Sequence, residues 1–244
     1  MDDAPWRDPP RRLGLRPGCL HLWLASLSTR PGDLARLERL LSPEERLEAR
    51  RFHRPADRLR SVAARAALRT ILAAYLQERP QSLRLTTEPS GKPCLDGLQF
   101  NLSHAGNLAL VAVSKEKRIG VDIEKLRELP AMQAVLSYIF TDEERAFVES
   151  HSGEHNTRAF FLIWNRREAA AKALGLDLLA SFSRLEIPVA AHSATGFLVP
   201  LIRTSGLPVG EDWWLRDFRP APGYAGALCL EGGSAELSWW RYQG

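Results

Sequence analysis

The spacing of apolar residues in the first half of the chain predicts strands flanking a helical block. Residues 19–25 (CLHLWLA) alternate in the manner of a strand. A helix is predicted from Ser42, which forms a capping box with Glu45, and a longer one from Pro55, which is followed by apolar residues at helical spacing. Further strands are predicted at 82–95 (with a turn), at 98–114 (two strands joined at 104–107) and within 119–128.

The second half has a similar architecture, with helices first and strands after them. Residues 130–140 predict a helix, and Thr141 with Glu144 predicts the capped start of another. Residues 151–156 are interpreted as a loop, and 157–176 as a strong helix that stops near Gly175. Strand-like segments then follow at 183–189, 212–218, 224–230 and 235–242. The order of elements predicts an α+β fold of two similar halves, 1–117 and 118–244.

Composition narrows the class of protein. The 244 residues are 45% hydrophobic and 25% charged, and no apolar run reaches the ~20 residues of a membrane span. The first 18 residues lack the apolar core of a secretory signal and are interpreted as an extended or loose lead-in. Three widely spaced cysteines predict neither a disulfide framework nor a zinc site, which favours a cytoplasmic location.

The net charge of the chain is too small to indicate a nucleic-acid partner, and it excludes few other kinds of ligand. The net charge is +4, and only five of the 33 basic residues are lysine. A codon preference explains most of this arginine excess, although arginine also suits anionic ligands or an acidic protein partner. No signature of RNA or DNA binding occurs, so no nucleic-acid partner is expected.

Two acids in the strand predicted within 119–128 are the first candidates for chemistry. Asp122 and Glu124 are two residues apart, so they share one face of a strand. Such a pair can be exposed to solvent, neutralised by arginine, or bound to a metal such as Mg²⁺. Glu168 and Lys172 lie four residues apart on one helical face, where an ordinary surface ion pair is the simpler interpretation. Trp164, on the same stripe, places that face near the core instead.

Ser103 and His104, at the end of a strand, are the next candidates. No nucleophile elbow or triad order accompanies them, so they favour phosphate binding or a plain turn over hydrolysis. Arginines at positions 46–69 and Lys92 in a Gly-Lys-Pro turn could supply a phosphate clamp, although most must be solvated helix faces.

The order of these motifs is similar to that of the Sfp-type 4′-phosphopantetheinyl transferases. The motifs are LSPEERLEARRF followed by arginine, GKP, FNLSHAG, GVDIE and W-x-x-R-E-A-x-x-K-x-x-G, between about residues 41 and 178. The resemblance implies a pseudo-twofold monomer of two α+β halves with coenzyme A in the cleft between them. It implies transfer of phosphopantetheine from coenzyme A to a serine of an apo acyl or peptidyl carrier protein, with release of adenosine 3′,5′-bisphosphate.

The resemblance also implies roles for individual residues. Asp122, Glu124 and Glu168 fall on the family's Mg²⁺ ligands, and Lys172 on the lysine near the pyrophosphate. The remaining positions that would contact coenzyme A are Arg51, Arg54, Arg60, Ser61, Lys92, Ser103 and His104. Glu168 is the expected base for the carrier serine, directly or through a water at the metal, with Lys172 and His104 as catalytic donors. The carrier protein is expected near residues 130–144, where core packing of Met132, Val135 and Phe140 is the preferred interpretation.

Two positions depart from the family pattern, and other functions stay open. Arg167 stands where the family usually has lysine, and Asp177 replaces the second glycine of a G-x-G-L segment. Since charge is kept at residue 167, little loss is expected there. The alternatives are a holo-acyl-carrier-protein synthase dedicated to fatty-acid synthesis, a non-catalytic coenzyme A or carrier-protein binding module, and an unrelated Mg²⁺ phosphohydrolase.

Overall fold

A computed structural model describes residues 2–176, 187, 189, 197–200 and 212–244. The first half contains β1 (Cys19–Ser26), a 3-10 turn (Pro31–Asp33), α1 (Leu34–Glu38), α2 (Pro43–Ala49), α3 (Pro55–Leu76), a second 3-10 turn (Pro80–Ser82), β2 (Thr86–Thr87), β3 (Pro93–Cys94), β4 (Gln99–Ala105) and β5 (Leu108–Ser114). The second half contains β6 (Ile119–Lys125), α4 (Met132–Ile139), α5 (Asp142–Glu149), α6 (Glu154–Leu174), β7 (Phe197–Pro200), β8 (Asp212–Phe218), β9 (Tyr224–Glu231) and β10 (Glu236–Tyr242).

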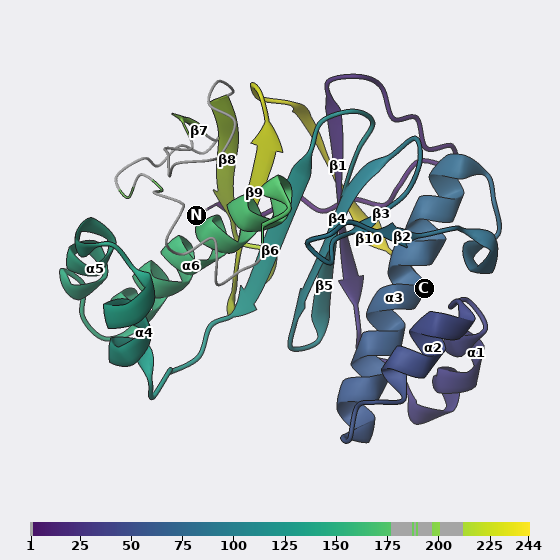
Figure 1. The fold of residues 1–244 in the computed structure, drawn as a ribbon, viewed down its shortest axis with the longest axis horizontal. Coiled ribbons are helices and arrows are strands. Elements are labelled where there is room, and N and C mark those ends of the chain that lie inside the picture. The colour runs from purple at the N-terminus through teal and green to yellow at the C-terminus, as the bar shows by residue number, and fades with distance from the viewer. Residues whose placement is uncertain (1, 177–186, 188, 190–196, 201–211) are drawn as a thin grey trace.

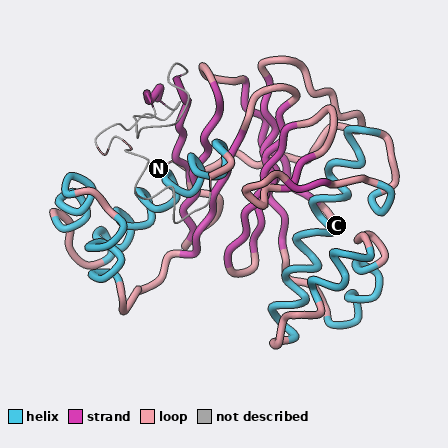
Figure 2. The backbone as a smooth tube through the Cα atoms, in the orientation of Figure 1, coloured by secondary structure: helices cyan, strands magenta, loops and turns pink. Residues whose placement is uncertain are grey.

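The described strands form two four-stranded sheets and the small β2–β3 pair, with helices on the outside (Figures 1 and 2). The first sheet has the order β10-β1-β5-β4, and the second has the order β6-β9-β8-β7. A buried cluster joins them: Leu20, Leu22, Leu110 and Ala112 of the first sheet pack with Ile119, Val121, Ile123, Leu228 and Leu230 of the second. The outer face of the first sheet packs on α3, and β6 and β9 pack on α6. Each half is therefore a sheet with one long covering helix.

The last strand of the chain returns to the first sheet. β10 pairs in parallel with β1, with Cys19 opposite Glu236 and Ala25 opposite Tyr242. β10 therefore follows residue 117 in the chain but belongs to the first sheet. The division of the chain at residue 117 otherwise stays a prediction. Because β1 is covered by α3 on one face and by the second sheet on the other, five of its eight residues are buried, so burial does not follow the alternation of its sequence.

The two predicted capping boxes are confirmed. Ser42 accepts a hydrogen bond from the backbone of Glu45, and Glu45 accepts one from the backbone of Ser42. Thr141 and Glu144 make the same pair of bonds at the start of α5. Local sequence determines both helix starts because each cap lies within four residues.

Some predicted boundaries were wrong. α6 begins at Glu154, so half of the segment interpreted as a loop is helical. The segment at 82–95 forms only the two-residue strands β2 and β3. The first residues are extended and pinned: Trp6 donates to the carbonyl oxygen of Pro220 and packs edge-on against Trp239. The predicted strand at 183–189 lies mostly outside the described residues, as does Asp177.

Candidate active site

The acid pair of β6 faces α6. Ile119, Val121 and Ile123 fill the core between the sheets, so the alternate residues point the other way. Asp122 is 3% exposed, whereas Glu124 is partly exposed and pairs with Arg127 at 3.2 Å. The shared face expected from the sequence is therefore confirmed.

Gly120 lets α6 approach this face. A Cβ atom at residue 120 would lie 1.9 Å from the carbonyl oxygen of Ala169 and 2.5 Å from the amide nitrogen of Ala173. Only glycine permits that separation, because real side chains do not approach so closely. The close approach brings Glu168 and Lys172, which flank this contact on α6, against Asp122.

These groups form one polar cluster. The Lys172 ammonium donates to Asp122 Oδ1 at 2.7 Å and to Ser103 Oγ at 3.1 Å, and lies 3.4 Å from Glu168 Oε2. The Ser103 hydroxyl donates to Asp122 Oδ1 at 2.8 Å. Asp122 Oδ2 is buried and has no hydrogen-bond partner among the described residues. A buried carboxylate oxygen without a partner is costly unless something binds it.

The electrostatics of the cluster reflect crowded negative charge. Burial raises the pKa of Glu168 to about 7, and the charges of Asp122 and Glu124 add to the effect against the opposing charge of Lys172. Burial and the charge of Asp122 also raise the pKa of Glu124. Burial acts to lower the pKa of Lys172, but Asp122 and Glu168 outweigh it, so that pKa is raised. The acids favour a positive partner.

The carboxylate oxygens of the cluster suit a hard cation as ligands, but they are not arranged around a single metal position. Three carboxylates, one with an unpartnered buried oxygen, fit the all-oxygen preference of Mg²⁺. Among residues 2–176 and the other described positions, however, no three His, Cys, Asp or Glu side chains are grouped as metal ligands. The Lys172 ammonium lies between Asp122 and Glu168 instead.

Strand β4 carries residues to two different places. Asn101 accepts a hydrogen bond from the backbone of Val121, and Ser103, on the same face of β4, reaches Asp122. His104 points to the opposite face and lines a cavity beside α3. Ser103 and His104 therefore contribute to adjoining sites. The turn after β4 uses Gly106 with a φ of 54°.

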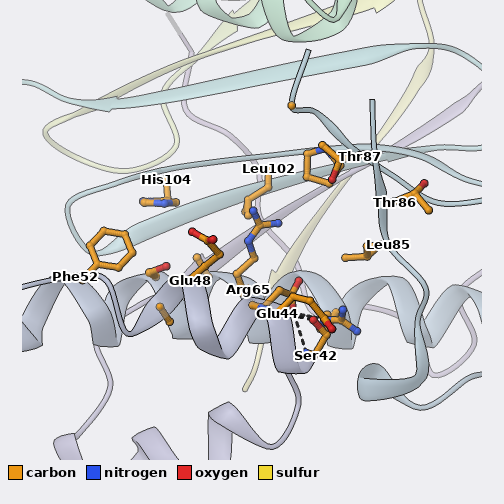
Figure 3. A pocket seen from close by; sticks show the side chains of 17 residues that line it. Ser42, Glu44, Glu48, Phe52, Arg65, Leu85, Thr86, Thr87, Leu102 and His104 are labelled. Carbon is orange, nitrogen blue, oxygen red and sulfur yellow. Dashed lines mark hydrogen bonds and ion pairs between the residues drawn. The ribbon is translucent and has the colours of Figure 1, made fainter. Parts of the chain in front are cut away.

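The cavity lies in the first half, between α2, α3 and the β2–β3 pair (Figure 3), and has a volume of about 700 Å³. Arg65 rises from α3 into it, and His104 and Phe52 border one end. The pKa of His104 is lowered by its removal from bulk solvent and by the charges of Lys172, Arg65 and Arg60. Lys172 therefore acts electrostatically on a residue of the cavity, which links it to the polar cluster.

The other predicted coenzyme A contacts are more scattered. Ser61 lines the cavity, and Arg60 is paired with Asp57. The Lys92 ammonium donates to the carbonyl oxygen of Ile119 at 3.0 Å, and burial lowers its pKa. Arg51 is paired with Glu48 at the surface and Arg54 is exposed; neither is among the described residues that line the cavity.

The structure also assigns places to residues that sequence reasoning left out or underestimated. Arg65, one of a run of similar arginines, could not be singled out by spacing. Arg167 is fully buried and holds both oxygens of Glu144, at 2.8 and 2.7 Å. This bidentate pair anchors α6 to α5, so Arg167 holds two helices together as well as carrying a positive charge.

Three apolar side chains of the segment expected near a carrier protein pack inward, although much of the segment is exposed. Phe140 is 7% exposed, and Met132 and Val135 pack partly buried against the same cluster. The preferred core interpretation is therefore confirmed. Tyr138 of the same segment does not pack in the core, because 89% of its surface is exposed.

Comparisons with known proteins match both halves. The model of the 4′-phosphopantetheinyl transferase superfamily matches residues 118–229, and a model described as 4′-phosphopantetheinyl transferase, N-terminal, matches residues 28–116. The 4′-phosphopantetheinyl transferase HetI of Nostoc sp. is 32% identical over 243 residues, covering 97% of this chain and 98% of HetI. The 4′-phosphopantetheinyl transferase Sfp of Bacillus subtilis is 25% identical over 192 residues, covering 78% and 81% of the two chains.

A relative from an animal also matches. The L-aminoadipate-semialdehyde dehydrogenase-phosphopantetheinyl transferase of Xenopus laevis is 28% identical over 166 residues, covering 62% of this chain and 55% of the frog protein. No described helix is long and apolar enough to cross a membrane.

Proposed function

The chain belongs to the 4′-phosphopantetheinyl transferase superfamily, and from this we propose that it transfers phosphopantetheine from coenzyme A to a serine of an apo acyl or peptidyl carrier protein, with Mg²⁺. The observation that carries the proposal is the buried cluster of Ser103, Asp122, Glu168 and Lys172. It adjoins a cavity whose lining combines Arg65 and His104 with Glu44, Glu45 and Glu48, and Arg65 and His104 are the groups that would bind an anionic nucleotide there.

The metal would be held by Asp122, Glu124 and Glu168. The support is the unpartnered buried Asp122 Oδ2, together with the pKa of both glutamates, which burial and then the charge of Asp122 raise and which a bound cation would lower. When bound, Mg²⁺ supplies positive charge that stabilises a diphosphate and its leaving group.

The protein's own residues position and protonate the reactants. Lys172 and His104 donate to phosphate oxygens, and Arg65 and Ser61 bind the nucleotide end in the cavity, with Arg60 near enough to act electrostatically on His104. Glu168 accepts the proton of the carrier serine, because it is a carboxylate of the polar cluster and lies beside the proposed metal position. The serine oxygen then attacks phosphorus, and adenosine 3′,5′-bisphosphate leaves.

We also propose that the enzyme works in the cytoplasm as a monomer. Cys19, Cys94 and Cys229 are all free thiols, as expected in a reducing compartment. Both halves come from one chain, and the polar cluster is built from β4 and β6 with α6 of that chain, so the cluster needs no second subunit.

The experiment is intact-mass analysis of an apo carrier protein incubated with this protein, coenzyme A and Mg²⁺. We expect a mass gain of one phosphopantetheine, lost with EDTA and severely reduced by Asp122→Ala or Glu168→Ala. Binding of coenzyme A without a mass gain would instead support a binding module. Release of phosphate without a carrier would support a phosphohydrolase, and normal reaction by Asp122→Ala would refute the metal assignment.

A further inference from the structure

Lys172 occupies the centre of the acids that the proposed function assigns to a metal. Its ammonium contacts Asp122 Oδ1 at 2.7 Å, Ser103 Oγ at 3.1 Å and Glu168 Oε2 at 3.4 Å. An ammonium has three donors, one for each of these oxygens. The side chain is 28% exposed, so it reaches the cluster from a partly open side.

Each of the three acids already lies beside a protein cation, and two of the acids share one. Lys172 forms ion pairs with Asp122 and Glu168, and Arg127 forms one with Glu124 at 3.2 Å. A divalent cation bound through the unpartnered Asp122 Oδ2 would share that carboxylate with the Lys172 ammonium, which holds Oδ1. Two cations on one carboxylate repel each other strongly, because charges that are partly buried are poorly screened.

We propose that Lys172 is the counter-ion of the metal-free enzyme, which a divalent cation displaces from Asp122 and Glu168 when it binds. This inference rests on the proposed function, since it takes the three acids as the metal ligands. The long, flexible stem of lysine lets the ammonium move without moving α6. Once displaced, the ammonium is available to the anionic substrate, so one charge serves the enzyme both before and after metal binding.

If the inference is right, removing the charge of Lys172 strengthens metal binding, whereas damage to the structure of the site would weaken it. Lys172→Met keeps an unbranched apolar stem and removes the competing charge. Affinity for the metal should therefore rise about tenfold, which corresponds to about 1.4 kcal/mol. If Lys172 only held the site together, the same change would weaken metal binding.

The test is titration of the metal-free protein with Mn²⁺, followed by the electron paramagnetic resonance signal of the free ion. Mn²⁺ takes the same oxygen ligands as Mg²⁺. The titration is done at pH 8 because loss of the Lys172 charge makes the carboxylates easier to protonate, and a higher pH limits the competition between protons and Mn²⁺. Lys125→Met is the matched control, because Lys125 is exposed on the other face of β6 and carries the same charge. Lys172→Gln provides a second variant without the charge if Lys172→Met does not fold.

We expect the Kd for Mn²⁺ to fall about tenfold in Lys172→Met and in Lys172→Gln, and to stay unchanged in Lys125→Met. Asp122→Asn should weaken Mn²⁺ binding strongly. Unchanged or weaker binding in both Lys172 variants, with Asp122→Asn still damaging, overturns the counter-ion inference alone. Binding that is insensitive to Asp122→Asn overturns both this inference and the proposed metal site.

Discussion

The contact between Gly120 and α6 gives the sharpest prediction about how the site is built. A Cβ atom at residue 120 would lie 1.9 Å from Ala169 O, whereas ordinary contact begins at 3.4 Å. Gly120→Ala therefore requires α6 and β6 to separate by about 1.5 Å at this point. A rigid separation of that size would lengthen the Lys172–Asp122 hydrogen bond from 2.7 Å to about 4 Å.

The expected cost follows from the atoms involved. Overpacking of a core typically costs about 1–3 kcal/mol. We expect Gly120→Ala to lower the free energy of unfolding by about 3 kcal/mol or more, because the new Cβ atom would clash with backbone atoms of α6. Misplacement of catalytic groups by about 1 Å can cost about a hundredfold in rate. Ala169→Gly should not rescue Gly120→Ala, because the clash involves the carbonyl oxygen and amide nitrogen of α6 rather than a side chain.

Urea denaturation and the carrier-modification assay measure these two effects. Gly233→Ala is the control, because nothing lies within 4 Å of the Cβ position there, and its free energy of unfolding should stay within about 0.5 kcal/mol of wild type. Wild-type stability and activity in Gly120→Ala would refute the claim that this contact positions α6.

Three further predictions concern residues outside that contact. Arg167→Lys should lower the free energy of unfolding in urea by about 2 kcal/mol, because lysine cannot hold both oxygens of Glu144; wild-type stability would contradict this. Burial lowers the pKa of His21 to about 4, so between pH ~6.5 and ~4 only the unfolded chain gains this proton. The free energy of unfolding should therefore fall by about 3 kcal/mol more in wild type than in His21→Asn over that range, and equal slopes would argue against the assignment. Arg65→Gln should raise the KM for coenzyme A about tenfold with little change in kcat, and an unchanged KM would remove Arg65 from the proposed nucleotide site.

Short-range features of this chain were predictable. The capping boxes at Ser42 and Thr141, the turn at Gly106 and the shared face of Asp122 and Glu124 all depend on residues within four positions of one another. The motif order also pointed to the transferase family, which the comparisons support. The start of α6 was missed, because Ser152, Gly153 and Asn156 read locally as a loop although the helix continues through Asn156.

The sequence by itself determined the capped helix starts, the acid pair and the types of donor that the site contains, because these are set by neighbouring residues and side-chain chemistry. Only the tertiary structure decided that β10 joins the first sheet, that Gly120 admits α6, and that Lys172 lies between Asp122 and Glu168. Each of these depends on the packing of segments far apart in the chain. Their separation and orientation follow from the whole core, which residue spacing does not encode.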